Sequence, residues 1–198
     1  MPLWGATDSD ESKPKNLTTA QKKQVFANAS GWVLEAGSAL SGNDNTDADP
    51  EVLVAIGELS TSIGAADITE VEMVTTTADK SEGFTISVRV RYNEPVDVVT
   101  TGGTPTLAVT NDNSGTGSGR GPHSLSYASG TGTNELIFSL AIAAANAATN
   151  ADDVLTVGAQ NIALNSGTIK DASGTASDAA VAISAAQGTA AGSVTVTA

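Results

Sequence analysis

A strict alternation of apolar and polar residues between Phe84 and Tyr92 constrains the fold more than any other feature of the sequence. The intervening polar residues include Arg89 and Arg91. Successive side chains of a strand point to opposite faces, so this pattern predicts a half-buried strand of an antiparallel sheet. The apolar positions are Phe84, Ile86, Val88, Val90 and Tyr92.

Period-two patterns continue from Ile68 to the end of the chain. Turns rich in Gly, Asn, Asp and Ser separate them, at the roughly 8–12-residue spacing typical of a β-sandwich or barrel. We therefore predict an all-β, antiparallel sandwich or barrel over residues 67–198. The other expected strands are 71–75, 105–110, 124–128, 134–142, 154–157, 162–164, 168–170, 181–184 and 193–197.

Residues 1–66 lack this alternation. Residues 1–16 are polar, which indicates an extended arm. Apolar residues recur at spacings of three and four in 18–36, which predicts a helix with Thr18 or Thr19 as its cap. Residues 51–57 fit either a strand or a short buried helix. We interpret 1–66 as an extended, partly helical N-terminal arm and attachment segment.

Charge and composition exclude several classes of function. The chain has 198 residues, with 9 Lys and Arg against 22 Asp and Glu, a formal charge of −13. Binding to nucleic-acid or lipid phosphates requires clustered Lys and Arg, so we expect neither nucleic-acid nor membrane partners. No apolar stretch has the length of a signal peptide or a membrane span. The absence of Cys excludes disulfides and thiolate chemistry.

No group of residues predicts catalysis or a cofactor. The single histidine, His123, has no nucleophile-elbow motif near it, and we expect it on the surface or on an edge strand. The glycine-rich run 115–121 lacks the lysine of a phosphate-binding loop. We therefore expect a non-enzymatic protein without a cofactor.

The acidic clusters also lack a metal-binding pattern. A calcium-binding helix–loop–helix starting at Asp47 needs a glycine where Val52 stands, so 43–51 is interpreted as a solvated loop. Asp152-Asp153, and Asp171 with Asp178, lie in expected turns, where Asp usually satisfies the local backbone. We expect no metal site.

Six residues are candidates for partner binding. Arg89 and Arg91 could bind carboxylates of a partner subunit, but cross-strand ion pairs within the chain are favoured. Both tryptophans precede the expected sandwich, and tryptophan is a frequent interface anchor. For Trp4 we favour burial against a partner, and for Trp32 burial within its own chain. The six candidates are Leu3, Trp4, Phe26, Trp32, Arg89 and Arg91.

Residues 84–178 resemble the bacterial Ig-like repeats of large surface adhesins. This resemblance implies an Ig-like β-sandwich and carries over no catalytic residues. Some members of that family bind calcium in loops between domains, but no ligand set here matches theirs. Four blocks agree in order and spacing: the strand at 84–92 continued by Asn93-Glu94-Pro95-Val96, then Gly103-Thr104-Pro105-Thr106-Leu107, residues 127–138 and residues 162–174.

The N-terminal part resembles small virion structural proteins of tailed phages that infect marine cyanobacteria and their relatives. The similarity lies in Met1-Pro2-Leu3-Trp4-Gly5, Lys13-Pro14-Lys15 and Ala29-Ser30-Gly31-Trp32-Val33. It implies a decoration or cement protein of the virion, assembled in the host cytoplasm. Its partners would be the major capsid protein or other virion proteins, and it could form a homo-oligomer on the particle.

Two alternatives stay open. The chain could belong to the neck, the tail or a fibre of the virion. It could also bind a host-surface glycan through residues 96–104 and 111–123, if these loops share one end of the sandwich. These loops contain no aromatic residues, which sugar-binding platforms usually need, so we rank glycan binding lower.

Overall fold

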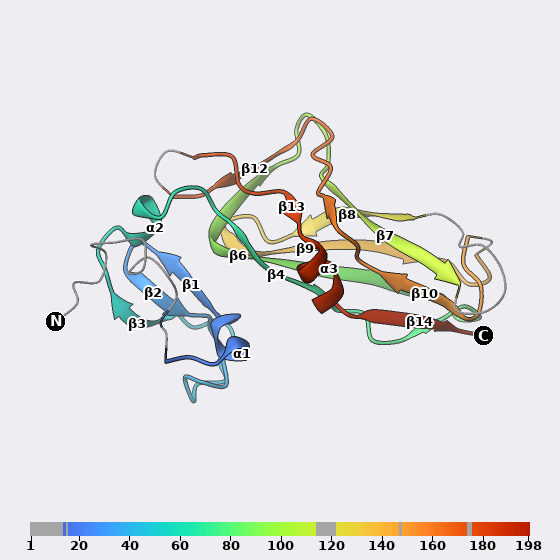
Figure 1. Ribbon diagram of the computed structural model, residues 1–198, viewed down its shortest axis with the longest axis horizontal. Coiled ribbons are helices and arrows are strands. Elements are labelled where there is room, and N and C mark those ends of the chain that lie inside the picture. The colour runs from blue at the N-terminus through green and yellow to red at the C-terminus, as the bar shows by residue number, and fades with distance from the viewer. Residues whose placement is uncertain (1–13, 15, 114–121, 147, 174–175) are drawn as a thin grey trace.

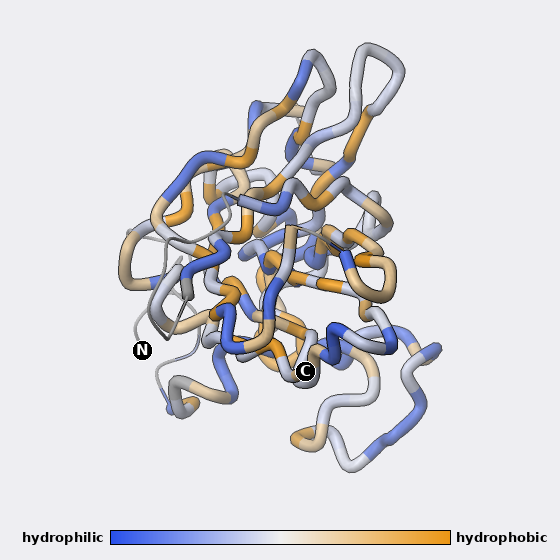
Figure 2. The backbone as a smooth tube through the Cα atoms, turned by 90° about the vertical axis from the view of Figure 1, so that its right-hand side faces the viewer, coloured by the Kyte–Doolittle hydropathy of each residue, from blue (hydrophilic) through white to orange (hydrophobic). Residues whose placement is uncertain are grey.

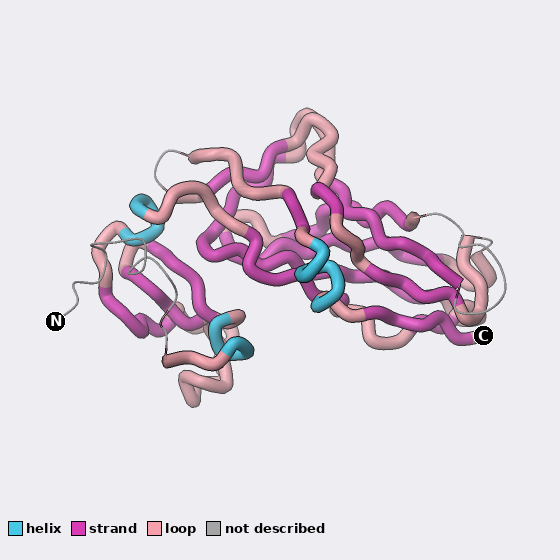
Figure 3. The backbone as a smooth tube through the Cα atoms, viewed as in Figure 1, coloured by secondary structure: helices cyan, strands magenta, loops and turns pink. Residues whose placement is uncertain are grey.

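The computed structural model describes residues 14, 16–113, 122–146, 148–173 and 176–198. Strands make up 47% of it and helices 8%, and most strands belong to one curled sheet. The prediction of an all-β chain is confirmed. Figures 1 and 3 show two parts, a small N-terminal sheet and a much larger sheet that extends to the C-terminus.

The larger part, which we call the β-domain (residues 66–198), is built around one long strand. This strand, β6, pairs with β9 along most of its length, with β4 beside its first half and with β12 beside its last residues. The sheet order is β12-β6-β9-β8-β7-β10-β14-β5, with β4 on β6. The strands are β4 (Ile68–Met73), β5 (Ala78–Asp79), β6 (Phe84–Val99), β7 (Thr106–Asn113), β8 (His123–Ser129), β9 (Thr133–Ile142), β10 (Asp153–Thr156), β12 (Thr168–Asp171) and β14 (Ser193–Thr197).

The large sheet curls until distant strands meet again. The backbone N–H of Met73, at the end of β4, donates to the carbonyl of Ala191, just before β14, at 2.9 Å. The curl encloses a core in which Ile86, Leu125 and Phe138 are fully buried. A short pair, β11 (Gln160–Asn161) and β13 (Ala182–Ile183), and the helix α3 (Ala185–Ala190) complete the β-domain.

Apolar and polar stretches are interspersed along the backbone (Figure 2), as expected for strands that each contribute alternate residues to a core. In the described residues, no helix is long and apolar enough to cross a bilayer.

The smaller part, which we call the N-terminal unit (residues 16–63), is a three-stranded antiparallel sheet in the order β1-β2-β3. It has its own apolar cluster, separate from that of the β-domain. The cluster consists of Val25, Ala27, Trp32, Leu34 and Leu59. The elements are α1 (Thr19–Lys22), β1 (Val25–Asn28), β2 (Gly31–Leu34), β3 (Glu51–Ala55) and α2 (Leu59–Ser62).

The prediction of a helix over 18–36 is wrong beyond its first turn. Thr18 does cap α1, because its side chain accepts a hydrogen bond from the backbone N–H of Gln21. Residues 25–34 then form a hairpin with a two-residue turn between Asn28 and Gly31. Gly31 has a φ of +131°, and a Cβ there would lie 2.0 Å from the carbonyl oxygen of Val54. This close approach of the two backbones, which only glycine allows, accompanies a strand here in place of the helix that the apolar spacing predicted.

The expected extended, partly helical arm is wrong for residues 16–63, because these residues form a compact sheet with a buried cluster. The open alternative at 51–57 is resolved in favour of a strand, since β3 covers Glu51–Ala55. Residues 1–13 and 15, which include Leu3 and Trp4, lie outside the described residues.

One expectation about the β-domain needs correction. The strand expected at 162–164 is shifted, because β11 lies at Gln160–Asn161 and Ala163 makes only a single bridge to Thr106. The helix α3 occupies a segment for which the sequence predicted no element. Ser184 caps it, and its side chain accepts a hydrogen bond from the backbone N–H of Gln187.

Candidate functional site

A connected set of ion pairs lies where the N-terminal unit meets the β-domain. Strand β1 packs against β6, on the face that carries Arg89 and Arg91. The sequence predicted that this face is open to solvent. The N-terminal unit covers part of it instead, and Arg91 is only 7% exposed.

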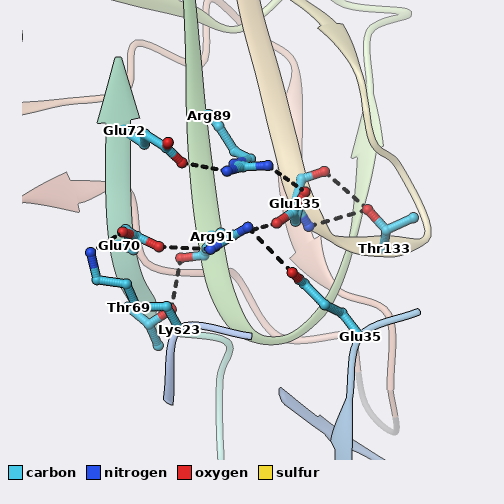
Figure 4. Close-up of polar contacts among 9 residues, drawn as sticks. All are labelled: Lys23, Glu35, Thr69, Glu70, Glu72, Arg89, Arg91, Thr133 and Glu135. Carbon is cyan, nitrogen blue, oxygen red and sulfur yellow. Dashed lines mark hydrogen bonds and ion pairs between the residues drawn. The ribbon is translucent and has the colours of Figure 1, made fainter. Parts of the chain in front are cut away.

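Arg91 lies at the centre of this junction (Figure 4). Its Nη1 is 2.9 Å from Glu70 Oε2 on β4, and its Nε bonds Glu135 on β9. Its Nη2 lies 3.4 Å from Oε1 of Glu35, which follows β2 in the N-terminal unit. One guanidinium therefore joins three carboxylates from two parts of the molecule.

The neighbouring charges extend this cluster. Arg89 pairs with Glu72, and its Nη1 is 3.6 Å from Glu135 Oε2. Lys23, in the N-terminal unit, pairs with Glu70. The strand register places Glu72 opposite Arg89, and such cross-strand pairs of opposite charge stabilise a sheet. Both candidate arginines are thus engaged by carboxylates of their own chain.

Burial and charge act against each other at this junction. Burial raises the pKa of Glu35, and the adjacent Arg91 offsets part of that rise. Burial lowers the pKa of Arg91, but the negative charges of Glu135, Glu35 and Glu70 together raise it by more than burial lowers it. The net shift is therefore upward, and the guanidinium stays charged. We call this set of charged side chains the ionic junction; it consists of Lys23, Glu35, Glu70, Glu72, Arg89, Arg91 and Glu135.

The apolar candidates of the N-terminal unit face inward. Trp32 is buried in the small cluster, which is the burial within its own chain that we favoured. Phe26 is mostly buried and lines a cleft of about 540 Å³ beside the ionic junction, together with Glu35 and Arg89. Leu3 and Trp4 fall outside the described residues.

A second polar group, around Glu94, lies between the two units and was not predicted from the sequence. Glu94 is fully buried, and Ser173 Oγ lies 3.2 Å from its Oε2, 2.6 Å from Oδ1 of Asp171 and 2.8 Å from the carbonyl of Ser60 in the N-terminal unit. Burial, with a contribution from Asp171, raises the pKa of Glu94 to about 8. The carboxyl therefore carries a proton at neutral pH.

The signal for Glu94 was present in the alternation. The pattern that ends at Tyr92 in our strand assignment continues through Glu94 to Val96, and β6 does so in the structure. Extending the strand by four residues would have placed Glu94 on the buried face.

The expectation of a surface or edge position for His123 is wrong. It is buried on β8, which lies between β7 and β9. Its Nε2 is 3.2 Å from both Asn111 Nδ2 and Thr149 Oγ1. Burial lowers the pKa of His123, and Asp153 opposes this in part. The alternation with Leu125 was the signal for an inward side chain.

The loop at 43–51 is exposed as expected, but Asp153 and Asp171 are buried in strands β10 and β12, so the expectation that they lie in turns is wrong. In the exposed loop 43–51, Asn45 N–H donates to Asn43 Oδ1 at 3.1 Å. Asp153 accepts from the N–H of Asn150 at 2.7 Å, and Asp171 accepts from that of Ser173 at 2.6 Å. Across the described ranges no three His, Asp or Glu side chains gather as a metal ion would require. The glycine-rich run 115–121 lies outside those ranges.

The two loops considered for glycan binding do not share one end of the sheet. Residues 100–105 precede β7, and residue 113 at its other end leads toward β8. A strand of 8 residues is roughly 25 Å long. The loops therefore start from opposite ends of β7.

The ionic junction connects the two folded units through ion pairs. Comparison of the chain with protein families, curated proteins and solved structures found no match. What the two units do together is therefore inferred from their own geometry.

Proposed function

We propose that the chain is a non-enzymatic structural protein of a tailed-phage virion, a decoration or cement protein of the capsid. In this proposal the N-terminal unit attaches to the major capsid protein or another virion protein. The β-domain is displayed on the particle surface.

The observation that carries the proposal is the position of the exposed apolar side chains. Of the five large apolar residues that are exposed in the described part of the chain, three belong to the N-terminal unit. They are Leu40, Val52 and Leu53, at 40%, 48% and 37% exposure. The unit also lies at the end of the molecule opposite the C-terminus (Figure 1). Exposed apolar surface of this kind is typical of interaction sites.

The folded state of residues 16–63 changes how attachment would work. We expected a segment that orders only on its partner. A sheet with a buried cluster offers a preformed surface instead, so binding loses less conformational entropy. The ionic junction would then hold this surface in a fixed relation to the displayed domain.

For the displayed β-domain we propose an Ig-like sandwich. Support comes from the antiparallel pairing of β6, β9, β8 and β7 and from the blocks of sequence that resemble adhesin repeats. Tyr92 adds to this support, because its buried ring is fixed when its hydroxyl donates to the carbonyl of Ala180 at 3.0 Å.

Attachment at many sites would make weak single contacts sufficient. Modules arrayed on one shell bind much more tightly than each module alone. The charge of −13 would keep free copies apart until they reach the particle. Glycan binding has less support, because its two loops start from opposite ends of β7.

The copy number of the chain in purified tailed-phage particles tests this proposal. We expect quantitative mass spectrometry to find hundreds of copies per particle, as for a shell component. Six or twelve copies would place the protein in a neck or tail ring. Absence from particles that encode the chain would contradict a virion role.

A further inference from the structure

Strand β3 has one paired edge and one open edge. It pairs with β2 on one side only, and no strand in the described residues pairs with the other. Four of its five residues are exposed. Figure 1 shows β3 on the side of the N-terminal unit away from the β-domain. An open edge presents unpaired N–H and C=O groups that another strand can bind.

The local geometry defines which groups face outward. The N–H of Ile56 donates to the carbonyl of Ser30 at 3.1 Å. Because successive N–H groups of a strand alternate in direction, the N–H of Ala55 points to the open edge. Trp32 pairs with Val54 and the next β2 residue with Val52, so Leu53 is an extra residue of a β-bulge.

Natural edge strands usually carry protection against pairing, such as a lysine or a proline within the strand. Residues 51–55 contain neither, and Val52 and Leu53 present exposed apolar side chains instead. The bulge at Leu53 bends the edge locally, but an apolar edge without lysine or proline favours the addition of a further strand.

The charge around β3 selects the kind of strand. No Lys or Arg occurs between Lys23 and Lys80. Asp47, Asp49 and Glu51 precede or begin the strand, and Glu58 follows it. A second copy would bring the same acidic flanks and a charge of −13, which opposes self-pairing.

We propose that β3 is a docking strand, to which an extended segment of another virion protein, apolar at its centre and flanked by Lys or Arg, adds as a fourth strand of the N-terminal sheet. This inference rests on the proposed attachment role of the N-terminal unit. Main-chain hydrogen bonds would supply affinity, and the apolar and acidic side chains would supply selectivity.

A peptide experiment tests the chemistry directly. The probe is a short synthetic peptide of alternating valine and threonine with lysines at both ends, added to the full-length chain. We expect slower amide exchange at residues 52–55, and binding that weakens as salt rises from about 50 to about 500 mM. Equal binding of the peptide with glutamates in place of lysines, or slower exchange only in the β-domain, would overturn the proposal.

Two variants and a matched control locate the contact. Ala55→Pro removes the outward N–H, and Leu53→Lys replaces an apolar side chain with a positive charge. We expect each to weaken peptide binding by about tenfold or more. Val99→Lys makes the same change of charge at a valine that is 50% exposed on the β-domain, and its binding should equal that of the wild type. If Ala55→Pro fails to fold, Leu53→Lys still decides the outcome.

Binding to particles separates this inference from the proposed function. If the wild type binds particles and Leu53→Lys binds equally well, β3 is not the docking strand, although a virion role stands. If the chain is absent from particles but binds the lysine peptide through β3, the virion role fails and the basic strand partner remains. If the wild type is a dimer that Leu53→Lys converts to monomers, the occupant is a second copy, and the proposed partner is wrong.

Discussion

The two units are both antiparallel sheets, but they differ in what holds them together. In the described residues the core of the β-domain contains 25 buried apolar side chains, whereas the separate cluster of the N-terminal unit contains five. Small sheets with few buried residues are marginally stable alone. The ionic junction compensates for this by tying the smaller unit to β6. We therefore expect the stability of the N-terminal unit to depend on the β-domain, and not the reverse.

The largest expected effect comes from truncating one aromatic in each core. Trp32→Ala should cost the N-terminal unit about 4 kcal/mol, because Trp32 is the largest side chain of its small apolar cluster. Hydrogen exchange should then lose protection over 25–63 only. Phe138→Ala, of similar cost, should lower protection in both units, because the N-terminal unit needs β6 as its support.

This pair of variants can contradict the expectation that the N-terminal unit depends on the β-domain and not the reverse. Loss of protection over the whole chain in Trp32→Ala would mean that the two units unfold as one. Retained protection of 25–63 in Phe138→Ala, while β6 opens, would mean that the N-terminal unit is stable by itself.

Arg91→Met should have the next largest effect. It leaves Glu35, Glu70 and Glu135 without their shared cation, and breaking a buried ion pair costs about 3 kcal/mol. Urea unfolding of the full chain measures this loss. Arg89→Met is the matched control, because its more exposed pairs should contribute about 1 kcal/mol or less. Equal losses for the two variants would show that Arg91 has no special role at the junction.

The buried carboxyl of Glu94 should make the free energy of unfolding fall as pH rises from about 6 to about 8. The native carboxyl keeps a proton up to a pKa of about 8, whereas the unfolded chain releases it near the ordinary glutamate pKa of 4.5. Its contribution to stability is thus complete below the unfolded pKa and is lost as pH rises toward 8. The loss between about pH 6 and pH 8 should be roughly 2 kcal/mol.

Glu94→Gln tests this sign, because the amide cannot ionise. We expect urea unfolding of Glu94→Gln to show little change from pH 6 to pH 8 where the wild type loses stability. Glu82→Gln removes an exposed carboxyl and should retain the wild-type slope. A wild type that is equally stable at both pH values would show that Glu94 is already ionised in the native protein.

The sequence allowed the β-domain to be predicted better than the N-terminal unit, for a physical reason. Along β6 a strict period of two coincides with one buried face, so pattern and burial agree. In 25–34 the apolar spacing also fits a helix. The structure is decided there by a non-local contact, the close approach of Gly31 to the backbone at Val54, which no local pattern encodes.

The ion pairs of the candidate site could be predicted from the sequence, but the burial of Arg91 could not. Arg89 and Arg91 on one face, in a chain rich in acids, were enough to favour internal ion pairs. The covering of Arg91 depends on a unit more than fifty residues earlier in the sequence, through Glu35. Glu94 was missed because our predicted strand stopped at Tyr92.

The smallest expected effect belongs to His123, on the β-domain only. Burial lowers its pKa below the usual value of 6.5, so the unfolded chain binds a proton at a pH where the native chain does not. Stability should therefore fall as pH drops from 6.5 through the native pKa. Since the chain has one histidine, a single imidazole resonance in NMR reports this pKa directly, and a value above 6.5 would contradict the burial.

The variant His123→Gln tests the effect on stability. Its side-chain oxygen can still accept hydrogen bonds from Asn111 and Thr149, and the free energy of unfolding of this variant should lose the acid dependence. Between neutral and mildly acidic pH, amide hydrogen exchange should change less over residues 25–63 than over β8. The reason is that both hydrogen-bond partners of His123, Asn111 and Thr149, belong to the β-domain.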